Sequence, residues 1–95
     1  MSAGNFQWDA EKAAVNLRWH GVAFEKALLV FRDAFAIERI DDRVDYGEER
    51  FNLIGMCDGA ILQVNYTERA GQIRIISARQ AENHEQDEYY RENSQ

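Results

Sequence analysis

The apolar residues of this chain follow helical spacing in its first third and alternate from about residue 35 onward. Apolar positions recur every three or four residues over 10–20, which predicts a helix that Asp9 caps and Gly21 ends. A short strand is expected just before it, at residues 6–9. The same helical spacing returns over 24–33 and predicts a second helix.

After the second helix the alternation predicts four strands, at 35–40, 50–56, 61–66 and 72–78. Asp58-Gly59 between the second and third of these strands is a strong signal for a hairpin. An acidic helix is expected over about 81–93. The sequence therefore predicts a single α+β domain over residues 1–95, with two N-terminal helices packed on one face of an antiparallel meander sheet and a C-terminal helix.

Composition narrows the class of protein. The chain has 17 acidic and 11 basic side chains and a formal net charge of -6, which argues against broad binding to nucleic acid through phosphate neutralisation. No apolar run is long enough for a membrane span, and no secretory signal is visible, so a cytoplasmic protein is expected. Cys57 is the single cysteine. Neither a phosphate-binding glycine loop nor a metal-ligand spacing is present, so no cofactor and no metal are expected.

Three arginines, Arg69, Arg74 and Arg79, lie in and just before the last predicted strand. Planar guanidinium groups match the geometry of phosphate, so the three could form an anion-binding cluster. Simple alternation would point Arg74 and Arg79 to opposite faces, unless the strand ends or bulges before Arg79. Alternatively, each arginine pairs with acids of the tail, where surface ion pairs contribute only about 0–1 kcal/mol. Both interpretations stay open.

His20 stands at the end of the first predicted helix. A protonated histidine there interacts favourably with the helix dipole, so His20 could serve only as a cap. Histidine also gains and loses a proton near neutral pH, which makes His20 a candidate for proton transfer or for facing a phosphate.

Val15 and Trp19 are four residues apart, on one side of the first helix and off the stripe that holds Ala13, Ala14 and Leu17. They could fill a second core contact or lie exposed for a partner. Tyr89 and Tyr90 are the large apolar groups of the acidic tail. Because aromatic residues are enriched where partners bind, we predict a partner-binding patch of Val15, Trp19, Tyr89 and Tyr90.

Several motifs of this chain, in order and at matching spacing, resemble the BrnT toxin family. They are "WD" at residues 8–9, Asn16, "HGV" at 20–22 with Phe24, "YTER" at 66–69 and "RIISAR" at 74–79. The resemblance runs from about Phe6 to Tyr89, nearly the whole chain.

This resemblance implies a RelE-like ribonuclease toxin of a type II toxin–antitoxin pair, which cleaves RNA without a metal and so inhibits translation. It also implies a hetero-oligomer with a BrnA-like ribbon-helix-helix antitoxin, through which alone the complex binds DNA. Such cleavage needs groups that move protons and cations that stabilise the charged phosphorus centre. His20 and Glu25 are the candidates for proton transfer, and Arg69, Arg74 and Arg79 for charge stabilisation.

Two positions depart from the family pattern. Members often have lysine immediately before the His-Gly pair, where this chain has Trp19, and the segment after "SAR" is usually basic, where this chain reads "QAENHEQDEYY". Both departures remove positive charge. They favour an alternative function, a catalytically weak toxin-fold module that acts with its antitoxin as a transcriptional repressor, whereas the retained arginines favour the enzyme.

Overall fold

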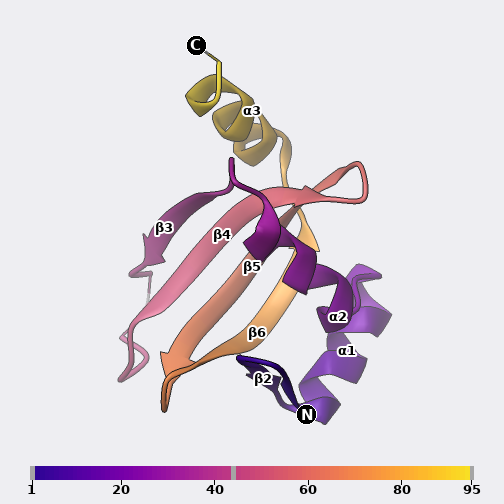
Figure 1. The fold of residues 1–95 in the computed structure, drawn as a ribbon, viewed down its shortest axis with the longest axis vertical. Coiled ribbons are helices and arrows are strands. Elements are labelled where there is room, and N and C mark those ends of the chain that lie inside the picture. The colour runs from indigo at the N-terminus through magenta and orange to yellow at the C-terminus, as the bar shows by residue number, and fades with distance from the viewer. Residues whose placement is uncertain (1, 44, 95) are drawn as a thin grey trace.

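The structure is a computed structural model that describes residues 2–43 and 45–94, and it is a single α+β domain (Figure 1). Its strands are β1 (Ser2–Ala3), β2 (Phe6–Trp8), β3 (Ile37–Asp41), β4 (Arg50–Cys57), β5 (Ala60–Arg69) and β6 (Gln72–Gln80). Its helices are α1 (Ala10–His20), α2 (Phe24–Ala27), the 3-10 helix η1 (Leu28–Arg32) and α3 (Asn83–Glu92). Within the described residues, no helix combines the length and apolar character that a membrane crossing requires.

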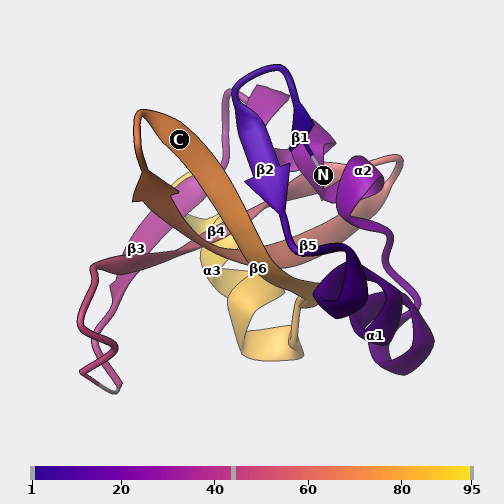
Figure 2. The same ribbon diagram turned by 90° about the horizontal axis from the view of Figure 1, so that it is seen from below.

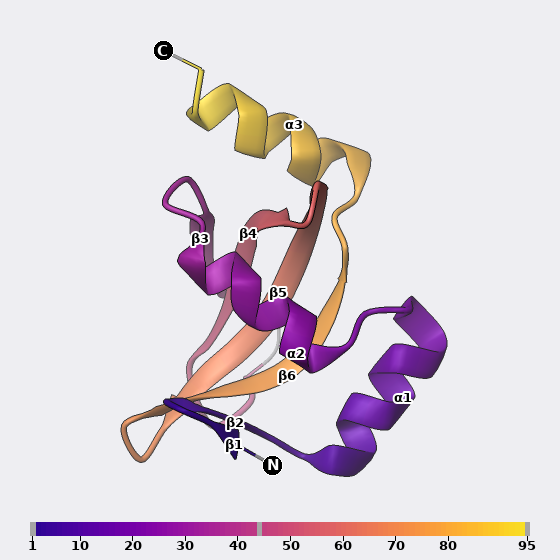
Figure 3. The ribbon, with the colours of Figure 1, turned by 45° about the vertical axis from the view of Figure 1, so that its right-hand side comes forward.

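The strands form one sheet in the order β1-β2-β6-β5-β4-β3. Strands β3 to β6 form the predicted antiparallel meander. The prediction of an entirely antiparallel sheet is wrong, however, because β2 pairs with β6 in parallel. An N-terminal strand can join only at an edge of the meander, and the parallel direction lets the chain continue into α1 along the remaining edge of β6 (Figure 3).

Helix α1 is held at that edge by a buried amide. The Asn16 side chain donates to the Ala78 carbonyl at 2.8 Å and accepts from the Ala78 N–H at 3.0 Å, so it satisfies the edge backbone where β2 has ended. Asn16 is 6% exposed, whereas Leu17, which the predicted apolar stripe would bury, is 51% exposed. The expectation that this stripe faces the core is therefore wrong at Leu17, although Ala13 of the stripe packs against the main core.

The two faces of the sheet carry separate apolar clusters. Helix α2 and η1 cover the main core, in which Phe24, Val30 and Val64 are fully buried. Helix α3 covers a smaller cluster on the other face, where Tyr89 packs with Ile54. Figure 2 shows α2 and α3 on opposite sides of the sheet. The predicted pair of N-terminal helices on one face is thus corrected, because α1 lies at the edge and the segment 24–33 is a short α-helix followed by η1.

Both sequence-predicted chain reversals at glycine are confirmed. Gly21 ends α1 in the left-handed conformation, with φ 70°. Asp58 and Gly59 form the two-residue turn between β4 and β5, with φ of 48° and 85°. These conformations are local properties of the sequence, which explains why the element boundaries there were predictable.

A bulge interrupts the pairing of β5 with β6. Asn65 lies opposite Ser77, but the next residue of β5, Tyr66, lies opposite Ile75. Ile76 is therefore an extra residue in β6. An extra residue resets the alternation of side chains beyond it, so the two halves of β6 present different sets of side chains to a given face.

The bulge brings the two strand arginines to one face. Arg74 lies opposite Thr67, and Arg79 lies opposite Gln63. Thr67 and Gln63 are four residues apart in a regular strand and so point to the same side. Arg74 and Arg79 therefore share the face that α3 partly covers, as the sequence allowed if the strand ended or bulged before Arg79.

Candidate functional site

An open polar pocket of about 310 Å³ lies on the α3 side of the sheet, beyond the end of the small apolar cluster. Strands β4, β5 and β6, the segment after β3 and the end of α1 all contribute to it. Its lining is His20, Arg43, Tyr46, Arg50, Gln63, Asn65, Ile76, Ser77 and Arg79. Such a concentration of cationic and amide groups on a sheet face fits an anionic ligand.

Arg43 is oriented by a buried carboxylate. Its Nε donates to Asp41 Oδ1 at 2.8 Å and its Nη2 donates to Oδ2 at 2.9 Å, while the Arg43 side chain is 71% exposed. The Asp41 side chain is 1% exposed and also accepts from the Asn65 amide at 3.0 Å. Asp41 fixes the orientation of the Arg43 guanidinium. Because a guanidinium has five N–H groups, Arg43 still has donors free for a ligand.

The hydrogen bonds from Arg43 hold the pKa of Asp41 at about 2, although burial acts in the opposite direction. Because the folded-state pKa lies below the ordinary value of 3.8, this carboxylate stabilises the fold above pH 4 and loses that effect as pH falls toward 2. The difference corresponds to roughly 2 kcal/mol.

We expect Asp41→Asn to lower the free energy of unfolding by about that amount at pH 7, with the gap to wild type closing between pH 4 and 2. Urea titrations of both proteins across this range measure the gap, and the comparison cancels the other acidic groups. A gap that stays constant with pH would contradict the assigned role of the Asp41 carboxylate.

Tyr46 and Arg50 form a second supported wall of the pocket. The Arg50 guanidinium carbon lies 3.8 Å from the centre of the Tyr46 ring, a cation–π contact. Arg50 also lies 3.4 Å from Glu48. The Tyr46 ring therefore lies against a cation, and its hydroxyl donates to Asp41 Oδ2 at 3.4 Å.

Arg79 is bound in a bidentate pair with Glu85 of α3, with distances of 2.7 and 3.0 Å. Glu85 is 8% exposed and its carboxylate also accepts from the Glu82 N–H at 2.8 Å, as the reciprocal cap of α3. Burial would raise the pKa of Glu85, but the hydrogen bonds from Arg79 and Glu82 lower it overall. Arg79 therefore pairs with an acidic residue of the tail, as one of the two sequence interpretations expected. It also lines the pocket.

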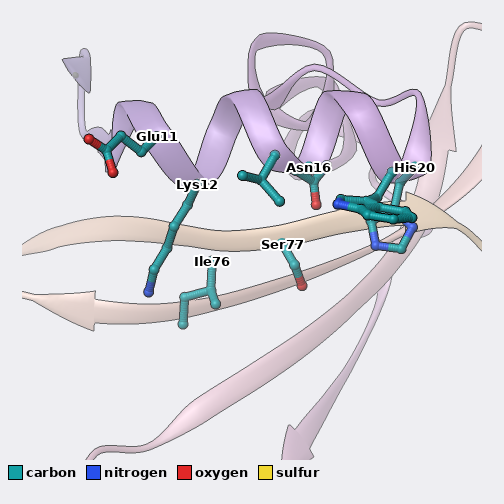
Figure 4. A pocket seen from close by; sticks show the side chains of 8 residues that line it. Glu11, Lys12, Asn16, His20, Ile76 and Ser77 are labelled. Carbon is teal, nitrogen blue, oxygen red and sulfur yellow. The ribbon is translucent and has the colours of Figure 1, made fainter.

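His20 lies where the pocket meets a second groove. It is exposed at the end of α1 and lines both the polar pocket and a groove of about 390 Å³ between α1 and β6. Ile76 and Ser77 line both spaces as well. Figure 4 shows His20 reaching from the helix toward the strand that carries Ile76 and Ser77. The bulge residue is therefore at the junction.

The other predicted site residues lie elsewhere. Glu25 is exposed and lines a cavity on the opposite side of α1, beside Leu17. Arg69 pairs with Glu48 at 2.8 Å near the β5–β6 turn. Arg74 donates to the side-chain oxygen of Gln7 at 2.7 Å and, although on the same sheet face, is not among the residues that line the pocket. The structure thus brings together His20 and Arg79 of the five.

Of the four predicted partner-binding residues, three are exposed and one is buried. Val15 and Trp19 are 52% and 75% exposed, and Tyr90 is 55% exposed. Tyr89 is only 5% exposed, and its hydroxyl donates to Asp33 at 2.6 Å. The expectation that Tyr89 belongs to an exposed patch is wrong, because this ring closes the apolar cluster under α3.

Sequence reasoning missed Arg43, Tyr46 and Arg50. Arg43 and Tyr46 lie in a polar connection that carried no motif. Their place in the pocket depends on the side-chain amide of Asn65, which is distant in the sequence. A usable signal was available, since functional residues concentrate in loops held by a rigid scaffold.

One group of side chains among the described residues could converge on a metal ion. Glu82, His84 and Glu85 offer ligand atoms within 4.8 Å of one another at the start of α3. The carboxylates of Glu82 and Glu85 are, however, already engaged in the helix cap, and that of Glu85 also holds Arg79. The geometry of this cluster is accounted for by the docking of α3.

Comparison with known proteins gives one clear match. A family model described as "Ribonuclease toxin, BrnT, of type II toxin-antitoxin system" matches residues 8–85. A search of curated proteins found no match. The matched segment contains α1, the whole meander and the start of α3, and so includes every residue that lines the polar pocket.

Proposed function

Because this chain belongs to the BrnT family of ribonuclease toxins of type II toxin–antitoxin systems, we propose that it cleaves RNA in the polar pocket on the α3 side of the sheet. The observation that carries this proposal is the bulge at Ile76, which aligns Arg79 and Ser77 with the amides of β5 beside His20. We further propose that the fold is RelE-like, that the protein acts in the cytoplasm, and that its cleavage of RNA inhibits translation.

The proposed chemistry is attack by the ribose 2′-oxygen on the neighbouring phosphorus. The 2′-hydroxyl proton passes to His20, the bond from phosphorus to the 5′-oxygen breaks, and that oxygen takes a proton from the Tyr46 hydroxyl. The products are a 2′,3′-cyclic phosphate and a free 5′-hydroxyl. These roles follow from the residue types in the pocket, since imidazole and phenol are the proton-transfer groups among its lining.

Arg43, Arg50 and Arg79 are proposed to stabilise the charge that builds on the phosphate oxygens. Donors that are already oriented cost no reorganisation during reaction, and Arg43 and Arg79 are each fixed by a carboxylate through two hydrogen bonds. This mechanism assigns no step to a metal. Glu25, Arg69 and Arg74, which the sequence also suggested, lie outside the pocket and receive no direct role in it.

The family also implies an antitoxin. We propose a BrnA-like ribbon-helix-helix protein that contacts the exposed apolar residues of α1, among them Val15. DNA is then bound only through this partner, because the chain itself carries a net charge of -6. A gel shift of promoter DNA with and without the antitoxin tests whether DNA binding requires the partner.

A repressor module with little catalysis is the second candidate function. It is favoured by the ion pairs that occupy the site arginines, above all the bidentate pair of Arg79 with Glu85. In that case the pocket would have little or no catalytic activity, and the chain would act only by binding its antitoxin.

Inducible expression of the chain without its antitoxin separates the two candidates. We expect growth arrest with RNA fragments that end in a cyclic phosphate, and recovery of growth when a gene for the proposed ribbon-helix-helix antitoxin is expressed as well. Unimpaired growth with intact RNA, at a protein level shown by immunoblot, would reject the ribonuclease and leave the repressor module.

A further inference from the structure

The groove between α1 and β6 is separate from the polar pocket in its chemistry. It has a volume of about 390 Å³ and runs along one side of the helix (Figure 4). Val15, Trp19 and Ile76 give it an apolar wall, and its polar lining is Glu11, Lys12, Asn16, His20 and Ser77. The proposed mechanism gives these apolar side chains no role.

Trp19 is the most prominent feature of this groove. Trp19 is 75% exposed, the largest exposed fraction of any large hydrophobic residue in the part of the chain that the structure describes. An exposed indole does not stabilise this fold, and exposed apolar surface of this kind usually marks a binding surface. Because Asn16 fixes α1 to β6, the backbone of Trp19, three residues further along the helix, also has a set position relative to the strand.

The groove continues directly into the polar pocket. His20, Ile76 and Ser77 line both, and His20 follows Trp19 in the chain. A ligand that spans the junction therefore meets three arginines and a histidine on one side and an indole on the other. Single-stranded nucleic acid has this alternation of chemistry, with a phosphate and a flat base in every nucleotide.

We propose that Trp19 is a stacking platform for one base of the RNA substrate, the base next to the phosphate that is cleaved. This inference rests on the proposed function, which places that phosphate beside His20. The base lies in the groove against the indole, with the Ser77 hydroxyl and Lys12 within the same lining to meet its polar edge.

Stacking on Trp19 also selects the form of the RNA. A base in a duplex is covered by its neighbours and cannot lie on a protein side chain, so the groove admits unpaired RNA. A protein partner would need the apolar wall alone. The adjoining arginines favour a ligand that carries phosphate, and we therefore assign the groove of the antitoxin-free chain to RNA.

The test measures the affinity of the full chain for a short single-stranded RNA with 2′-O-methyl groups, which cannot be cleaved. We expect Trp19→Ala to raise Kd by about 5- to 150-fold, the range of a single base–aromatic stack, and Trp19→Phe to restore most of the affinity. Tryptophan emission should fall on binding in wild type. The melting temperature should stay unchanged, since the side chain is exposed.

A scan with one abasic nucleotide at each position locates the stacked base. At one position the loss of the base should weaken binding to wild type but leave Trp19→Ala unaffected, which is the signature of a direct contact. Phe35→Ala is the matched control, because Phe35 is a 61% exposed aromatic that lines neither space.

Equal affinity of wild type and Trp19→Ala for this RNA would overturn the inference, even if wild type cleaves RNA. The same holds if Trp19→Ala loses affinity only for the antitoxin. Absence of any RNA binding or cleavage by wild type would instead overturn the proposed function and this inference together, so the two failures are distinguishable.

Discussion

Arg79→Ala is expected to reduce RNA cleavage by about 10²–10³-fold, the usual cost of removing one oriented donor to a charged transition state. Arg79→Lys should be impaired almost as strongly, because lysine keeps the charge but loses the bidentate fork. Single-turnover cleavage of a defined RNA by the purified variants measures both. Arg79 also holds α3 through Glu85, so we expect the alanine variant to lose about 2–3 kcal/mol of stability as well.

Glu85→Gln separates the two roles of Arg79. This variant removes the carboxylate that binds the guanidinium but leaves the guanidinium in the pocket. It should lose stability in urea titrations but retain more cleavage than Arg79→Ala at a temperature where it is folded, because the guanidinium is still present although less firmly oriented. If Glu85→Gln and Arg79→Ala lose stability equally while the folded Arg79→Ala protein cleaves at the wild-type rate, then Arg79 serves only to dock α3.

His20→Ala is expected to reduce cleavage by about 10²–10⁴-fold, the typical contribution of a positioned proton-transfer group. His20 is an exposed residue in the last turn of α1, so its loss should change the free energy of unfolding by less than about 1 kcal/mol, the limit set by its interaction with the helix dipole. Cleavage rates and circular-dichroism melts on the same protein preparation check the two statements.

The second histidine of the chain provides the matched control. His84 is exposed on α3 and does not line the polar pocket. His84→Ala should leave cleavage unchanged. A His20→Ala protein that cleaves at the wild-type rate, or a large loss of stability without a loss of rate, would return His20 to the role of a helix cap.

The sequence by itself determined the features that depend on neighbouring residues. The ends of α1, the Asp58-Gly59 turn and the meander of four strands follow from short-range backbone preferences and from side-chain periodicity, and all were predictable. The order of motifs likewise identified the family, which the family match confirms. His20, which lines the polar pocket, was a candidate from the sequence because its position at the end of a predicted helix is a local property.

Tertiary structure alone decided which residues meet. The bulge at Ile76 arises from pairing with β5, and no pattern within β6 states whether Arg74 and Arg79 share a face. Asn16 is buried and Leu17 exposed because the edge of β6 needs a hydrogen-bonding partner, which outweighs the apolar stripe of the helix.

The same limit explains the composition of the site. Arg43 joins the pocket because a buried carboxylate, Asp41, is held by Asn65 from a strand far along the chain. Tyr89 is buried because its ring makes the apolar contact between α3 and the sheet, and its hydroxyl donates to Asp33. Periodicity describes the two sides of one element, whereas burial and pocket lining are properties of several elements packed together, so they are fixed only when the sheet and its helices assemble.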